Sequence, residues 1–194
     1  MKDLEEKTIS EETIFKGRVV ELSVADVRLP NGKIAKRELI KHPGAVGIIP
    51  ITHDGKIVMV EQYRKPLEKT VVEIPAGKME VNEPKEETAQ RELEEETAQR
   101  ELEEETGYKA SGLELLTSFY TAPGFADEII HIYVARGLHK QNKPLAQDDD
   151  EFINVLEVTL DEAKQLIEEA SICDAKTMFA IQYLELEQLK AEEQ

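Results

Sequence analysis

The sequence lacks several features that would each define a class of protein. Among 194 residues it has no tryptophan and a single cysteine, Cys173. One cysteine excludes a disulfide framework and a cysteine-based zinc cluster, and we expect Cys173 to be a small core or near-core side chain with no redox role. No apolar run approaches the ~20 residues that a membrane helix needs, and the N-terminal segment MKDLEEKTIS is too polar for a signal peptide. We therefore expect a cytoplasmic protein with no membrane partner.

Positive charge is also scarce. The chain has 24 Lys and Arg residues against 41 Asp and Glu residues, a net charge of −17. Such a chain repels phosphates, and few aromatic side chains are present for base stacking, so the composition argues against nucleic-acid binding. An anionic substrate would need a local offset, for which a divalent cation is the obvious candidate. The alternative is that the acidic residues only keep the surface soluble.

The pattern along the chain predicts strands and helices that interleave without a βαβ rhythm. This arrangement favours an α/β (α+β) fold in which helices cover a mixed sheet, with a separate small sheet at the N-terminus. Thr159 or Asp161 is a plausible cap for the helix that follows it. The expected strands span residues 13–29, 33–42, 45–51, 56–64, 70–77, 112–122, 128–138 and 152–159, and the expected helices span 84–106, 160–170 and 173–193.

One segment of the chain is repeated. ETAQRELEE occupies residues 87–95 and again residues 96–104. Nine residues of helix turn by ~900°, which leaves a net rotation of about half a turn, so Glu92 and Glu101 would face opposite sides of one straight helix. The two copies therefore cannot both serve one site. One copy takes the functional position, and the other extends the helix or loops out.

Glutamates in this segment lie at helical spacing. Glu92 and Glu96, or Glu101 and Glu105, are four residues apart and share one helix face. Such carboxylates repel each other, and a hard cation such as Mg²⁺ or Mn²⁺ would turn that repulsion into affinity. The alternative for a glutamate run alone is a solvated acidic face.

The spacing of the surrounding residues resembles the Nudix hydrolase family, whose pattern is G-x5-E-x7-R-E-U-x-E-E-x-G-U, with U apolar. Forward from Gly77, the first copy matches as far as Glu96 but has Ala98 and Gln99 in place of glycine and an apolar residue. Backward from Tyr108, the second copy matches fully once Glu92 takes the place of Glu83. We predict that the second copy forms the metal site, and that residues around 78–91 form an enlarged loop, because loop closure costs little and losing the Gly107 helix stop costs more.

The resemblance extends over most of the chain and is closest to bacterial ADP-ribose pyrophosphatases of the Bacillus type. KRELIKHPGAVGI, VEQYRKPLEKTVVEIPAGK, FYTAPGFADE and the DDDEF loop carry it. It implies a Nudix α/β/α sandwich at residues 43–194, a small antiparallel β domain at residues 1–42, and a domain-swapped homodimer. It also implies Mg²⁺-dependent hydrolysis of the diphosphate of ADP-ribose to AMP and ribose 5-phosphate.

The same resemblance assigns roles to individual residues. Glu151 would be the general base on a moving loop, with an ordinary acidic turn as the alternative. Arg64 would contact the diphosphate unless it forms only a surface salt bridge. The remaining substrate contacts would be Arg37 near the adenine and Glu128 near the terminal ribose. The metal ligands would be the Ala76 carbonyl, Glu101, Glu104 and Glu105, with Glu104 also catalytic; in the alternative register they would be Glu92, Glu95 and Glu96.

The repeat leaves two further hypotheses open. An altered segment beside the diphosphate could shift the preference to another nucleoside diphosphate derivative or a capped RNA end. It could also displace Ala76 from the helix and leave a folded protein with a damaged site.

Overall fold

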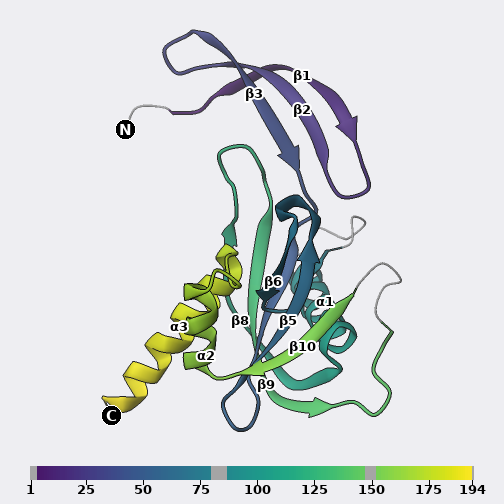
Figure 1. The fold of residues 1–194 in the computed structure, drawn as a ribbon. Helices are drawn as coiled ribbons and strands as arrows, with labels where there is room; N and C mark the ends of the chain where they lie inside the picture. Colours follow the sequence, from purple (N-terminus) through teal and green to yellow (C-terminus); the bar gives the residue numbers. More distant parts are fainter. Residues whose placement is uncertain (1–3, 80–86, 147–151, 194) are drawn as a thin grey trace. The chain divides into compact units, whose positions relative to one another are not determined.

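The computed structural model describes residues 4–79, 87–146 and 152–193 (Figure 1). Ten strands, three α-helices and the short 3-10 helix η1 (Lys65–Leu67) lie within these ranges. The strands are β1 (Lys7–Lys16), β2 (Glu21–Arg28), β3 (Ile34–Lys41), β4 (Ala45–Pro50), β5 (Ile57–Arg64), β6 (Lys69–Glu73), β7 (Ala76–Lys78), β8 (Tyr108–Tyr120), β9 (Ile129–Lys140) and β10 (Ile153–Val158). The helices are α1 (Glu87–Thr106), α2 (Leu160–Glu168) and α3 (Ala175–Glu192). None of the described helices is both long and apolar enough to cross a membrane.

The chain divides into two compact units, of which the first joins Met1–Ala45 with Phe119–Ile130. Its antiparallel sheet has the order β1-β2-β3. The turn between β2 and β3 has Gly32 at a φ of 83°, a left-handed conformation that glycine adopts without strain. The segment after β8 pairs with the end of β3, because Ile40 donates its N–H to the Phe125 carbonyl at 2.8 Å.

The second unit joins Val46–Ser118 with His131–Gln194 and contains two sheets. One is antiparallel with the order β10-β5-β6, and the other has the order β7-β4-β9-β8. In Figure 1 the strands of this unit lie between α1 on one side and α2 with α3 on the other. The mixed α and β architecture expected from the sequence is confirmed.

Helix α1 packs one face against the sheets and ends where a glycine stops it. Ala98 and Leu102, one turn apart, are fully buried beside Met79 and Tyr133. Gly107 follows the helix with a φ of 73° and donates its N–H to the Glu103 carbonyl. The C-terminal stop of the helix was expected from the sequence and is confirmed.

The enlarged loop expected at residues 78–91 is wrong for residues 87–91, which are helical in α1. Residues 80–86 lie outside the described part of the chain. The first copy of the repeat therefore extends the helix. No proline or glycine interrupts residues 87–106, and each residue added to an existing helix gains a backbone hydrogen bond without a new nucleation step.

Smaller differences concern element ends. Strand β1 begins at Lys7, whereas the sequence pattern indicated a start near residue 13. Of the two caps considered for α2, Thr159 is the one observed: its hydroxyl accepts from the Glu162 N–H, and the Glu162 carboxylate accepts from the Thr159 N–H. This reciprocal pair is a capping box, so Asp161 lies inside the first turn.

Candidate active site

Strand β7 and the C-terminal half of α1 approach each other closely. A methyl group placed on Gly77 would lie 1.9 Å from the Glu101 carboxyl carbon and 2.1 Å from its Oε1. One turn along the helix, the Glu105 Oε2 accepts the backbone N–H of Ala76 at 3.1 Å. Glu101 of the second copy and Glu105, which follows that copy directly, therefore supply the carboxylates that lie against Ala76 and Gly77.

Arg100 pairs with Glu101 and with Glu104. Its guanidinium donates to Glu104 at 2.7 Å and to Glu101 at 2.8 Å. Partial burial opposes the charge of Arg100, but the carboxylates of Glu101 and Glu104 outweigh it and raise the Arg100 pKa above its ordinary value. Arg100 thus offsets part of the repulsion within the glutamate run.

The donor chemistry of this region fits a hard divalent cation. Carboxylate oxygens are the ligands that Mg²⁺ prefers, and Glu101 occupies space that only the missing side chain of Gly77 leaves open. Across residues 4–79, 87–146 and 152–193, however, no three His, Cys, Asp or Glu side chains converge on a common ion position. The expected ligands Glu101, Glu104 and Glu105 therefore do not converge on one ion position by themselves. Mg²⁺ usually keeps several waters and takes further ligands from substrate phosphates, so it does not require a complete set of protein ligands.

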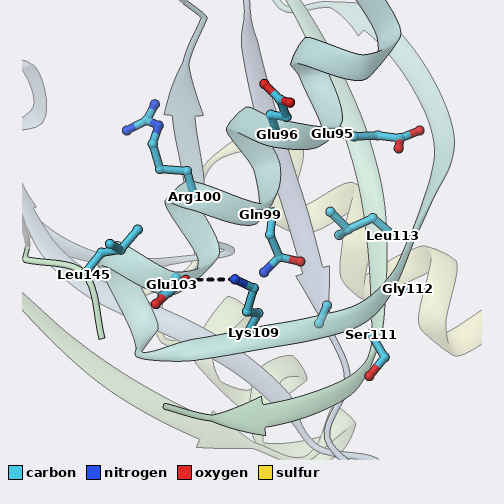
Figure 2. A pocket seen from close by; sticks show the side chains of 11 residues that line it. Glu95, Glu96, Gln99, Arg100, Glu103, Lys109, Ser111, Gly112, Leu113 and Leu145 are labelled. Carbon is cyan, nitrogen blue, oxygen red and sulfur yellow. Dashed lines mark ion pairs between the residues drawn. The ribbon is translucent and has the colours of Figure 1, made fainter. Parts of the chain in front are cut away.

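The glutamates of the alternative register lie elsewhere. Glu95 and Glu96 are exposed and line a surface cavity of about 560 Å³ that also includes Gln99, Lys109 and Leu113. Figure 2 shows both glutamates on the turn of α1 above Arg100, and shows Lys109 paired with Glu103 on the cavity wall. The side chain of Glu92 lies outside the described part of the chain. Glu95 and Glu96 thus line this cavity, whereas the carboxylate found beside Gly77 is that of Glu101.

Arg64 is held by a buried carboxylate. Its Nε and Nη2 donate to the two oxygens of Glu73 at 2.8 and 2.9 Å, and these hydrogen bonds raise the Arg64 pKa above its ordinary value. Burial disfavours the charged form of Glu73, but Arg64 and Lys176 outweigh burial and lower its pKa from 4.5 to about 2. Glu105 also contributes to the electrostatic environment of Arg64. The salt bridge considered from the sequence is present, but its acidic partner is buried.

The other expected substrate contacts belong to the first unit. Arg37 forms a two-pronged ion pair with Glu6, at 2.8 and 2.6 Å. Glu128 accepts a hydrogen bond from the Thr121 hydroxyl and lies 3.6 Å from the ring of His42. The proposed general base, Glu151, lies outside the described residues.

Comparison with known proteins then decides the family. The NUDIX domain family matches residues 41–98 and 96–180, and the two matches meet inside the repeat. The chain belongs to the NUDIX family. A second family, described as the nucleoside diphosphate sugar hydrolase N-terminal domain, matches residues 6–40 of this Nudix hydrolase.

Several relatives of this Nudix protein are named. It is 58% identical to the methanol dehydrogenase activator of Bacillus methanolicus, with 95% of each chain covered. It is 55% identical to the ADP-ribose pyrophosphatase of Bacillus subtilis over 97% of each chain. A crystal structure titled ADP compounds hydrolase has the same fold, with a TM-score of 0.77 and 24% sequence identity over 99% of this chain and 98% of the other.

Sequence reasoning missed two buried charged residues beside Arg64. Glu73 and Lys176 are both buried and form an ion pair, although 103 residues separate them in the chain. Glu73 carried one available signal, because it immediately precedes the Ile74-Pro75-Ala76-Gly77 segment. Lys176 carried none, because a lysine in the first turn of a helix is usually exposed.

Proposed function

We propose that this chain is a divalent-metal-dependent ADP-ribose pyrophosphatase that produces AMP and ribose 5-phosphate, and that the second copy of the repeat forms its metal site. The observation that carries the proposal is the close approach of Glu101 to Gly77, together with the Ala76–Glu105 hydrogen bond. The 55% identity to an ADP-ribose pyrophosphatase over 97% of both chains supports the substrate.

In this proposal each residue has a defined task. The Ala76 carbonyl and the carboxylates of Glu101, Glu104 and Glu105 would hold Mg²⁺, or Mn²⁺ in its place. A bound ion would offset the diphosphate charge and acidify an attacking water. Glu151 would accept the proton of that water.

Arg64 would donate to the diphosphate, and its planar guanidinium suits phosphate oxygens. Arg37 would contact the adenine and Glu128 the terminal ribose. Residues 1–42 would form the dimerisation domain of a domain-swapped homodimer in the cytoplasm, and residues 43–194 the hydrolase domain.

The repeat itself provides a matched test. Glu95→Gln and Glu104→Gln are the same substitution in identical nine-residue segments. Hydrolysis of ADP-ribose with Mg²⁺ would be measured for the full chain, for both variants, and for a chain lacking residues 87–95. We expect Glu104→Gln to lower kcat by about 100-fold or more, and Glu95→Gln to change it less than about threefold.

Other outcomes would each overturn a different part of the proposal. Loss of activity in Glu95→Gln alone would assign the site to the first copy. A silent full chain beside an active shortened chain would show that the duplication damages the site. Activity of the full chain on other nucleoside diphosphate derivatives alone would show a shifted preference.

A second candidate function is activation of a methanol dehydrogenase, which the 58% identity to a protein of that name favours. The test is the rate of a purified methanol dehydrogenase with and without this chain and Mg²⁺. Stimulation by the full chain that is lost in Glu104→Gln would support this function and connect it to the same site. No stimulation at any concentration of the full chain would reject it.

A further inference from the structure

Four alternating charges form a row that ends at Arg64. Arg64 on β5 pairs with Glu73 on β6, Glu73 pairs with Lys176 on α3, and Lys176 pairs with Asp174 at 2.9 Å. The side chains of Glu73 and Lys176 are only 4% and 9% exposed, whereas that of Arg64 is 39% exposed. The row therefore runs from a buried lysine to a partly exposed arginine.

The middle of this row fixes the orientation of a single carboxylate. Oxygen Oε2 of Glu73 accepts from both Arg64 Nη2 and Lys176 Nζ, while Oε1 accepts from Arg64 Nε. With a pKa of about 2, Glu73 remains ionised at any working pH of the enzyme. A guanidinium has five N–H donors, of which Glu73 takes two, so three are left that Glu73 does not engage.

Lys176 is itself held by the first turn of α3. Asp174 caps this helix by accepting from the Thr177 N–H at 3.2 Å, and its same oxygen accepts from Lys176 Nζ. The Thr177 hydroxyl accepts the backbone N–H of Ile74 at 3.0 Å in a buried position. The start of α3 is thereby fastened to the end of β6, two residues before Ala76.

Stability alone is a weak reason for such a row, because a buried ion pair is commonly no more stabilising than apolar side chains of similar volume. A fixed carboxylate that accepts two hydrogen bonds from a guanidinium can, however, affect anion binding. It restricts the rotamers of Arg64 and so reduces the entropy lost when the remaining donors engage an anion.

We propose that Lys176 is a positioning residue that acts through Glu73 to hold Arg64 in the orientation required for diphosphate binding. This inference rests on the proposed function, because it takes Arg64 as the diphosphate contact. It extends the site to α3, a helix that contributes none of the site residues expected from the sequence.

Kinetics with ADP-ribose and Mg²⁺ would test the inference through a double-mutant cycle. Lys176→Met keeps an unbranched side chain, one atom shorter than lysine, and removes its charge. We expect it to raise KM about tenfold with kcat changed less than threefold, since Arg64 binds ground state and transition state alike. Lys176→Met should have no further effect in an Arg64→Ala background, and Lys176→Arg should restore most of the lost affinity.

The matched control is Lys164→Met, which breaks another lysine–glutamate pair in the same unit, with Glu185 at 2.7 Å. We expect its KM to equal that of the unmodified chain. The inference would be overturned if Lys176→Met left KM unchanged. It would also be overturned if Lys176→Met raised KM by the same factor in the Arg64→Ala background as in the unmodified chain.

A second measurement separates this inference from the proposed function. The Nε–H signal of Arg64, assigned by its absence in Arg64→Ala, reports in ¹H–¹⁵N spectra whether Glu73 holds the guanidinium in the protein without substrate. We expect a sharp signal in the unmodified chain and a broadened one in Lys176→Met. If the chain fails to hydrolyse ADP-ribose but the signal broadens, the proposed function falls and the positioning of Arg64 stands. An unchanged signal overturns the inference, whatever the activity.

Discussion

The contact between Gly77 and Glu101 allows a sharp prediction for Gly77→Ala. The added methyl group would lie 1.9 Å from the Glu101 carboxyl carbon and 2.1 Å from its Cγ, where real contacts essentially never fall below 3.0 Å. Since Cγ is blocked as well as the carboxylate, rotation of the carboxylate alone cannot relieve the clash. Glu101 must withdraw from β7 by about 1 Å or more, a displacement that costs roughly 100-fold in rate for a precisely placed group.

The assay is kcat for ADP-ribose with Mg²⁺, together with Mn²⁺ affinity by titration calorimetry. We expect Gly77→Ala to lower both while the protein stays folded. Gly112→Ala is the matched control, because a methyl group on Gly112 would meet no atom within 4 Å. If Gly77→Ala kept its metal affinity and a kcat within about threefold of the unmodified chain, Glu101 could not be a metal ligand held against β7.

Three further predictions concern stability, each measured by urea denaturation. Leu102→Ala should lower the free energy of unfolding by about 2–5 kcal/mol, because Leu102 is fully buried. Leu93→Ala, the same change in the first copy, should lower it clearly less, because Leu93 is only partly buried. Equal decreases in the free energy of unfolding would contradict this. Because the Glu73 pKa is lowered to about 2 in the folded state, ionised Glu73 stabilises the fold fully above about pH 4.5, and this contribution is lost as the pH falls towards 2. The free energy of unfolding of Glu73→Gln should lack this part of the pH dependence. An unchanged decrease between pH 4.5 and pH 2 in the variant would refute the lowered pKa of Glu73. Ala170→Gly should stabilise by about 0.5–1 kcal/mol, because Ala170 has a φ of 57° that glycine adopts more readily, and a loss of stability would show that its methyl group packs favourably.

Local patterns in the sequence predicted local structure well. The stop at Gly107 and the Thr159 cap depend on residues within one or two turns, so the chain near each position contains the information that decides it. Two expectations from the sequence conflicted here: the uninterrupted run predicted a helix at residues 84–106, whereas weighing loop closure against the glycine stop predicted a loop around residues 78–91. Helix propensity over an uninterrupted stretch was the stronger signal.

Tertiary ion pairs were beyond such reasoning. The Glu73–Lys176 pair depends on how α3 docks on β6, and neither residue has a sequence neighbour that indicates the other. Arg64 was identified because the sequence resembles a known family, yet that resemblance did not reveal Glu73, the carboxylate that accepts hydrogen bonds from Arg64. The charged groups that touch a substrate are thus easier to find in a sequence than the groups that hold them in place.

The repeat shows why identical sequence does not give identical environment. Nine residues turn a helix by ~900°, so equivalent positions fall about half a turn apart. Leu102 of the second copy is buried in the core. Glu94 of the first copy, about two turns earlier in the helix, also faces the core and is only 5% exposed. Its equivalent in the second copy, Glu103, lies on the cavity wall beside Lys109 instead.

A carboxylate at a core-facing position costs several kcal/mol unless polar partners meet it. Strand β9 supplies them: the Tyr133 hydroxyl donates to Glu94 at 3.2 Å, and the His131 ring nitrogen lies 3.4 Å from the same oxygen. His131 and Tyr133 are two residues apart on a strand and therefore share the face that meets α1. The longer helix is accommodated at Glu94 because this carboxylate meets a polar pair, while Glu101 and Glu105 lie against Gly77 and Ala76.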